Sequence, residues 1–79
     1  MADWKEVNHT ITHTYEFEDF RSALGFINKV GDLAEEAQHH PDITLFDYSK
    51  VNISLTTHDE GKVTQKDRLL AAQIDQISA

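Results

Sequence analysis

The sequence predicts an α+β fold, in which an antiparallel four-stranded sheet carries helices on one face. Two stretches in which apolar and polar residues alternate, residues 10–17 and 51–57, predict strands. Two stretches with apolar residues three or four apart, residues 19–39 and the segment after residue 64, predict helices. With two further short strands, the predicted order is ββαββα, in a single domain spanning residues 1–79.

The first predicted hairpin joins residues 4–7 to residues 10–17 through a turn at Asn8 and His9. The second of these strands is rich in β-branched and aromatic side chains, which favour a pleated, half-buried surface. One face of this strand carries Ile11, His13, Tyr15 and Phe17, and the other carries Thr10, Thr12, Thr14 and Glu16. We expect His9 and His13 to occupy surface positions.

The first predicted helix begins at Glu18 and Asp19, because carboxylates favour the positive N-terminal end of a helix. Its apolar stripe consists of Phe20, Ala23, Leu24, Ile27, Val30, Ala34 and Ala37. Two flanking apolar residues widen this face, as expected where a helix is partly core and partly subunit contact. Gly31 costs roughly 1 kcal/mol relative to Ala, unless a neighbouring backbone comes close there. Pro41 is expected to stop the helix, because it forces the preceding residue toward extended geometry.

The second predicted hairpin joins residues 43–48 to residues 51–57 through a turn at Ser49 and Lys50. Val51, Ile53 and Leu55 alternate with polar residues, which makes this the clearest strand of the chain.

A polar loop at residues 58–63 separates this strand from the last helix. Thr64 and Asp67 match a capping-box pattern, with Asp in place of the usual Glu. The stripe that follows, which predicts the helix itself, is formed by Leu70, Ile74 and Ile77.

The composition excludes several classes of protein. The chain has 79 residues, a formal net charge of −7 and no cysteine, so disulfides and thiolate zinc sites are impossible. A domain of this size buries only about 60% of its unfolded surface, and such domains usually need a metal or a partner subunit. The acidic balance argues against nucleic acid as a partner, and no apolar run approaches the ~20 residues of a membrane span. Without a recognisable secretory signal, we expect a cytoplasmic protein.

Four residues form the candidate chemical site. Glu35 and His39 lie four apart on the predicted helix and therefore share a face, with His40 directly after them. His58 ends the clearest strand. Where the helix end and the strand end meet, three imidazoles and a carboxylate converge. Such a cluster can hold one imidazole protonated and another neutral near pH 7, as paired general acid and base catalysis requires.

Other interpretations of these residues stay open. A histidine pair at a helix end is also found as a favourable terminal charge in solvent. Three histidines and a glutamate suit a divalent metal ion, although the spacing H-E-x-x-H is absent. Asp67 has a sufficient role as a helix cap. A nucleophile is poorly supported, because the chain has neither cysteine nor a G-x-S-x-G elbow.

Four segments together resemble the pterin-4a-carbinolamine dehydratase family. They are E-E-A-Q-H-H-P-D at residues 35–42, Y-S-K-V at 48–51, L-T-T-H-D at 55–59 and T-Q-K-D at 64–67. The motifs E-x-x-x-H-H-P and T-H-D, at this separation, are specific. The resemblance extends from Trp4 to Ile77, nearly the whole chain.

The resemblance implies a hydro-lyase, a 4a-hydroxytetrahydrobiopterin dehydratase. It would convert 4a-hydroxytetrahydropterin to quinonoid dihydropterin in tetrahydrobiopterin recycling, with no metal or organic cofactor. The implied catalytic residues are His39, His40 and His58, of which His58 and His39 are favoured as the acid–base pair. The implied substrate-binding residues are Glu35, Gln38, Thr56, Thr57, Asp59 and Asp67. A non-catalytic pterin-binding or protein-interaction module with the same fold is the alternative.

The resemblance also implies a homo-oligomer, a tetramer or a dimer, built by strand-edge pairing and helix packing. Three departures from the family pattern stand out. Only three residues precede Trp4, so we expect the family's first helix to be missing. Ile43 replaces a common aromatic residue, and Lys62 replaces a common glycine, placing a cation near the site.

Overall fold

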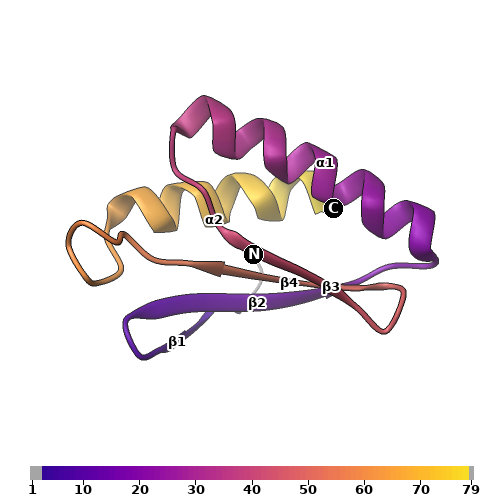
Figure 1. Ribbon diagram of the computed structural model, residues 1–79, viewed down its shortest axis with the longest axis horizontal. Coiled ribbons are helices and arrows are strands. Elements are labelled where there is room, and N and C mark those ends of the chain that lie inside the picture. Colours follow the sequence, from indigo (N-terminus) through magenta and orange to yellow (C-terminus); the bar gives the residue numbers. More distant parts are fainter. Residues whose placement is uncertain (1–2, 79) are drawn as a thin grey trace.

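The computed structural model describes residues 3–78, and it confirms the predicted α+β class. Residues 1–2 and 79, at the limits of the predicted domain, lie outside this range. The elements are β1 (Lys5–Val7), β2 (Thr10–Glu16), α1 (Phe20–Ala37), β3 (Asp42–Phe46), β4 (Lys50–Leu55) and α2 (Gln65–Ser78). The strands form one antiparallel sheet in the order β1-β2-β4-β3. Both helices cover the same face of this sheet, and they pack against each other (Figure 1).

The turn between β1 and β2 lies where the sequence predicts it. Asn8 and His9 both have positive φ, 51° and 64°, and Val7 pairs with Thr10 across them. Two-residue hairpin turns favour such left-handed residues because their twist matches that of the strands.

The predicted turn at Ser49 and Lys50 is wrong by two residues. Asp47 and Tyr48 adopt left-handed φ values of 48° and 51°, which reverse the chain earlier. Phe46 therefore pairs with Lys50, and Lys50 is the first residue of β4.

Helix α1 begins as predicted but ends sooner. The carboxylate of Asp19 accepts a hydrogen bond from the backbone N–H of Ser22 at 2.7 Å and so caps the helix. At the other end Gln38 takes a left-handed φ of 53°, and its N–H bonds to carbonyls of the last turn. The helix thus ends at Ala37, before Pro41 exerts its effect, and the residues that follow are free of helical geometry.

Strand β4 also ends early, at Leu55 rather than at residue 57. Thr57 instead forms an isolated bridge with Lys62, and its carbonyl accepts hydrogen bonds from the N–H groups of Glu60 and Gly61. His58 therefore lies in a tight turn after the strand rather than at the strand end.

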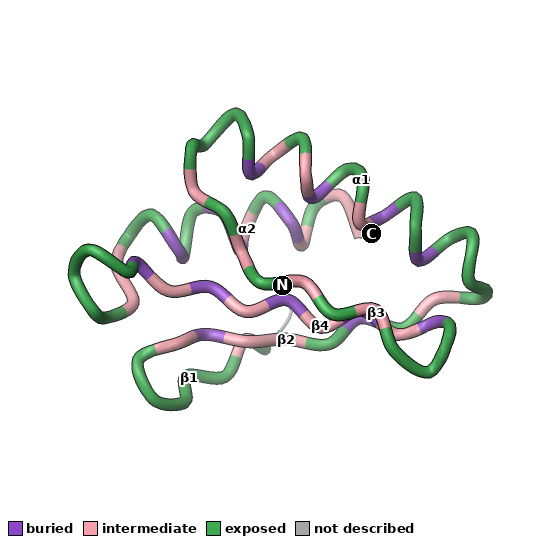
Figure 2. Tube along the Cα trace, viewed as in Figure 1, coloured by how far each residue is buried: buried purple, intermediate pink, exposed green. Residues whose placement is uncertain are grey.

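The core lies between the two helices and the inner face of the sheet. Every second residue of β4 is buried, and the buried residues of both helices face them (Figure 2). The core consists of Ile11, Tyr15, Ala23, Phe26, Val30, Val51, Ile53, Leu55, Leu70, Ala71 and Ile74. The alternation corrects one expectation: His9 is exposed, but His13 faces inward and is half-buried, with its ring centroid 4.6 Å from that of Tyr15.

Gly31 meets no neighbouring backbone in the described part of the chain. No heavy atom of residues 3–78 beyond its own helix would lie within 4 Å of a Cβ built there, so the helix simply tolerates this residue. Within residues 3–78, no helix is both long and apolar enough to cross a membrane.

Candidate active site

The segment after α1 and the turn after β4 line an open cavity of about 250 Å³. Because α1 ends at Ala37, His39 and His40 lie outside the helix, at the cavity. His58 reaches the cavity from the turn at residues 58–61. The cavity is lined by Gln38, His39, His40, Thr57, His58, Asp59 and Lys66. All three histidines singled out from the sequence thus reach one site.

His39 is held from behind by a buried carboxylate. Its Nε2 lies 2.5 Å from Oδ1 of Asp67, and Asp67 is fully buried while the His39 side chain is 14% exposed. The other oxygen of Asp67 accepts hydrogen bonds from the Thr57 hydroxyl at 2.8 Å and from the Thr64 N–H at 2.9 Å. Asp67 therefore joins the start of α2, the end of β4 and the segment after α1.

This network determines which nitrogen of His39 carries a proton. Burial would raise the pKa of Asp67, but the hydrogen bonds from His39, Thr64 and Thr57 outweigh burial and hold that pKa below its usual 3.8. An ionised carboxylate only accepts hydrogen bonds, so Nε2 of His39 must donate. In the neutral imidazole, Nδ1 is then the nitrogen with a free lone pair.

His40 pairs with a different carboxylate from the one its neighbour uses. Its Nε2 lies 2.5 Å from Oε2 of Glu35, and both side chains are more than half exposed. The sequence pattern predicts that Glu35 faces His39, which is wrong because α1 ends before His39. The predicted carboxylate is thus at the site but orients the other imidazole.

His58, like His40, is exposed. Within residues 3–78 its side chain makes no hydrogen bond or ion pair. It can therefore exchange protons with solvent and approach a ligand without first breaking a contact.

The predicted substrate-binding residues divide into three groups. Gln38, Thr57 and Asp59 line the cavity. Glu35 and Asp67 act behind the histidines. Thr56 does not reach the cavity, since its hydroxyl donates a hydrogen bond to the carbonyl of His9 at 2.7 Å.

Lys66 is the lining residue that sequence reasoning missed. Lys62, expected near the site, is absent from the cavity wall, while Lys66 contributes to it. Its position could have indicated this role, because Lys66 directly precedes Asp67 in the T-Q-K-D segment, in the first turn of α2.

The alternative of a metal site finds no ligand set in the part of the chain that is described. No three His, Asp or Glu side chains among residues 3–78 are grouped closely enough to hold one metal ion.

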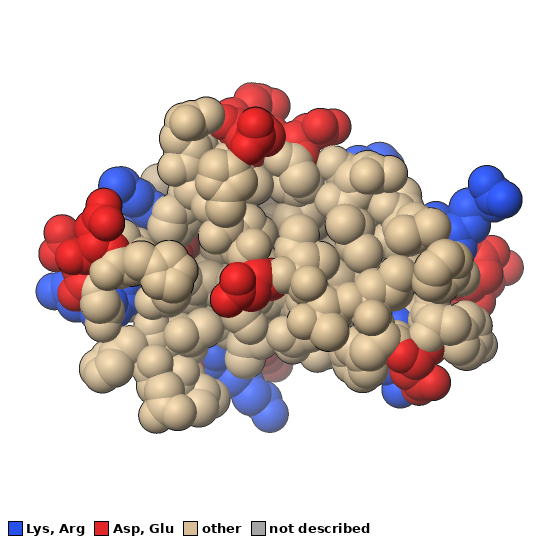
Figure 3. Space-filling view, viewed as in Figure 1, with Lys and Arg blue, Asp and Glu red and all other residues tan. Residues whose placement is uncertain are grey.

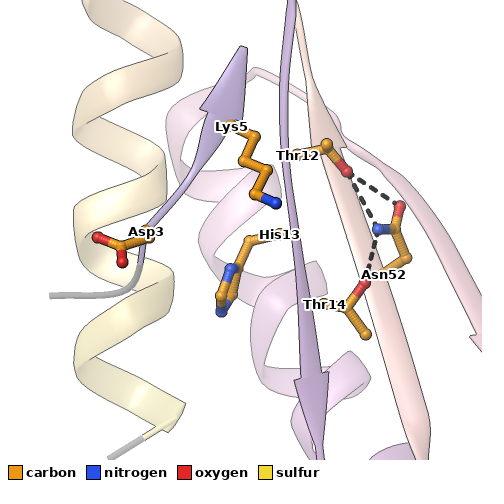
Figure 4. Close-up of a pocket in the computed structure, with 6 residues that line it drawn as sticks. All are labelled: Asp3, Lys5, Thr12, His13, Thr14 and Asn52. Atoms are coloured by element: carbon orange, nitrogen blue, oxygen red, sulfur yellow. Dashed lines mark hydrogen bonds between the residues drawn. The ribbon is translucent and has the colours of Figure 1, made fainter. Parts of the chain in front are cut away.

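A second cavity, of about 370 Å³, lies on strands β1, β2 and β4 (Figure 4). It is lined by Asp3, Lys5, Thr12, His13, Thr14 and Asn52. The amide of Asn52 donates hydrogen bonds to the hydroxyls of Thr12 and Thr14, so these polar groups satisfy one another. None of the predicted site residues lines it, and the histidine cavity remains the candidate active site.

Comparison with known proteins gives a consistent result. The chain matches the family described as pterin 4 alpha carbinolamine dehydratase over residues 1–77. A protein of Thermomicrobium roseum, provisionally named a pterin-4-alpha-carbinolamine dehydratase, is 42% identical over 79 residues, which are 100% of this chain and 84% of that protein. A protein of Cyanothece with the same provisional name is 49% identical over 78 residues, 99% of this chain and 79% of that protein.

Solved structures share the fold. A transcriptional coactivator/pterin dehydratase from Brucella melitensis superimposes with a TM-score of 0.90 and 33% identity, covering 96% of this chain and 82% of that one. A pterin dehydratase-like protein identified as a RuBisCO assembly factor in the alpha-carboxysome has a TM-score of 0.81 at 22% identity, covering 99% and 92%, and so shares the fold alone. On the family match and these relatives, the chain belongs to the pterin 4 alpha carbinolamine dehydratase family.

Proposed function

We propose that this protein dehydrates 4a-hydroxytetrahydropterin to quinonoid dihydropterin by histidine general acid–base catalysis, and so serves tetrahydropterin recycling. Family membership supports the dehydratase activity. The observation that carries the mechanism is the meeting of His39, His40 and His58 at one cavity, with His39 fixed by the buried Asp67.

The reaction breaks one C–O bond and moves two protons. Hydroxide is a poor leaving group, so an acid must protonate the oxygen on C4a as the C–O bond breaks, which releases water. A base takes the proton of a ring nitrogen. The electron pair left on that nitrogen forms the new double bond of the quinonoid product.

His39 is suited to act as the base. Its Nδ1 carries the lone pair, and the negative charge of Asp67 stabilises the imidazolium that forms when Nδ1 accepts a proton. His58 is suited to act as the acid, because its exposed ring recovers a proton from solvent after each turnover. His40, held by Glu35, orients the substrate.

The decisive experiment measures dehydration of synthetic 4a-hydroxytetrahydropterin by the parent protein, His39→Ala and His58→Ala. We expect each substitution to lower kcat by about 10²- to 10⁴-fold, the usual contribution of a general acid or base. Circular dichroism should show unchanged folding, and His9→Ala, at an exposed turn outside the cavity lining, is the matched control. If both variants react at the parent rate, the catalytic assignment is wrong.

The same assay tests the alternative of a non-catalytic module. Parent protein that binds pterin but shows no rate above the uncatalysed background would favour a binding or interaction role.

A homo-oligomer, with a tetramer as the expected form, is part of this proposal. Phe20 and Leu24 on α1 and Phe46 on β3 are large apolar side chains that are between 41% and 49% exposed. Burial of such surface against another copy would supply stability that a 79-residue chain lacks alone. Light scattering at micromolar concentration tests it, and a 9.0 kDa monomer would contradict it.

A further inference from the structure

A third cavity, of about 340 Å³, adjoins the histidine cavity on the side of α2. The two cavities share Thr57, Asp59 and Lys66, so they are parts of one continuous depression. The residues that belong to this adjoining cavity alone are Glu60, Thr64 and Gln65.

The sizes of the two cavities allow one ligand to occupy both. The histidine cavity, at about 250 Å³, is smaller than the roughly 300–1,000 Å³ of typical small-molecule sites. With the adjoining cavity the depression falls within that range. A fused bicyclic ring placed against the histidines would leave the adjoining cavity for whatever substituent the ring carries.

The chemistry of the adjoining cavity is specific. The side chains of Glu60, Gln65 and Lys66 make no hydrogen bond or ion pair within residues 3–78, so their polar groups are available to a ligand. The hydroxyl of Thr64, in contrast, is already bonded to that of Thr57 at 2.7 Å. In Figure 3 acidic and basic atoms gather together at the left end of the molecule, where Figure 1 shows the loop between β4 and α2.

The charges favour one kind of substituent. Two carboxylates, Asp59 and Glu60, face a single lysine, Lys66, in the adjoining cavity. Ionised carboxylates only accept hydrogen bonds, so they suit hydroxyl or amino groups and repel an anionic group.

We propose that the adjoining cavity is the subsite for the ring substituent of the substrate, and that Glu60 and Gln65 select a substituent that donates hydrogen bonds and carries no negative charge. This proposal rests on the proposed dehydratase function. It names Glu60 and Gln65 as specificity-determining residues, outside the groups that move protons.

The test compares three synthetic 4a-hydroxytetrahydropterins, which carry a methyl group, a short hydroxylated chain, or the same chain ending in phosphate. We expect the parent protein to show kcat/KM about tenfold higher for the hydroxylated than for the phosphorylated substrate, since about 1.4 kcal/mol corresponds to tenfold. Higher salt should narrow this ratio, because Glu60 is exposed and its charge is screened.

Variants then locate the selectivity. Glu60→Lys should invert the ratio in favour of the phosphorylated substrate, and Gln65→Ala should lower kcat/KM for the hydroxylated substrate alone. Glu36→Lys makes the same change of charge on an exposed residue of α1 that lines neither cavity, and it should leave the ratio at the parent value.

The outcomes separate the two proposals. Absence of any dehydration of the methyl substrate by the parent protein would refute the dehydratase function itself. Dehydration of the methyl substrate, with an equal kcat/KM for the other two or an equal response to Glu60→Lys and Glu36→Lys, would overturn only the subsite.

Discussion

Two aspartates of α2 bind their neighbours in the same way but with different consequences. Asp67, in the first turn, accepts hydrogen bonds from His39, Thr57 and Thr64. Asp75, near the other end, accepts a hydrogen bond from the Tyr15 hydroxyl at 2.5 Å and from the Trp4 indole N–H at 3.1 Å. Both carboxylates tie α2 to distant parts of the chain.

The difference lies in the partner. An imidazole changes charge near neutral pH, whereas an indole N–H never does and a phenol does so only in strong alkali. The pKa of Tyr15 is raised further, first by burial and then by the hydrogen bond and the charge of Asp75. One helix thus carries a carboxylate that can support proton transfer and a second that anchors Trp4 and β2.

The largest expected effect separates the two aspartates by activity. Asp67→Asn should lower kcat by about 100-fold, because the amide removes the charge that stabilises the His39 imidazolium. Asp75→Asn should change kcat by less than about twofold, since Asp75 lines neither cavity of the site. Equal losses in the dehydration assay would show that both aspartates act only through stability.

Tyr15→Phe should affect stability and not activity. The change removes a hydrogen bond to a carboxylate, worth about 1.5–3 kcal/mol in the free energy of unfolding, which urea denaturation measures. Because the pKa of Tyr15 is higher in the folded state than its ordinary 10.0, its stabilisation is complete below pH 10 and is lost as pH rises further. The parent should therefore destabilise above pH 10 more steeply than Tyr15→Phe, and parallel alkaline curves would contradict this.

The Asp67 network should show the opposite pH dependence. Its pKa is lower in the folded state than 3.8, so its stabilisation is present above that pH and is lost as pH falls below it. Thermal unfolding between pH 2 and 5 should show a shallower slope for Asp67→Asn than for the parent. An unchanged slope would mean that the carboxylate is not stabilised in its ionised form.

The smallest effect comes from a change that touches neither aspartate. Gly31→Ala should raise the free energy of unfolding by up to about 1 kcal/mol, because Ala favours the helix and its Cβ has open space. kcat should stay at the parent value. A loss of stability would point to a neighbouring copy packed against α1, because the added Cβ has open space within this chain.

Most of the fold could be predicted because periodicity records which side chains are buried. The alternation in β2 and β4 identifies the core residues of those strands, apart from His13. The stripe predicted for α1 is right at Ala23, Val30 and Ala34. Its other members Phe20, Leu24 and Ala37 are exposed, whereas Phe26, one of the flanking apolar residues, is buried. The chain reversals were harder. Asn8 signals its turn, but Tyr48 and Gln38 adopt left-handed conformations that are uncommon for their residue types, so the sequence does not signal these two reversals.

The site follows the same division. That three histidines meet could be expected, since Glu35, His39 and His40 are close in sequence and His58 follows a strand. Which carboxylate binds which histidine depends on where α1 ends. Because Gln38 is left-handed and ends the helix, Glu35 binds His40 instead of His39, and His39 binds Asp67.

The indole of Trp4 makes the protein its own fluorescent probe. Trp4 is the single tryptophan of the chain, and its N–H is bound to Asp75 on α2. Its emission should shift to longer wavelength when the N-terminal segment separates from α2, and it lies apart from the histidine cavity. Tryptophan fluorescence can therefore follow the separation of the N-terminal segment from α2. Turnover reports independently on the histidine cavity.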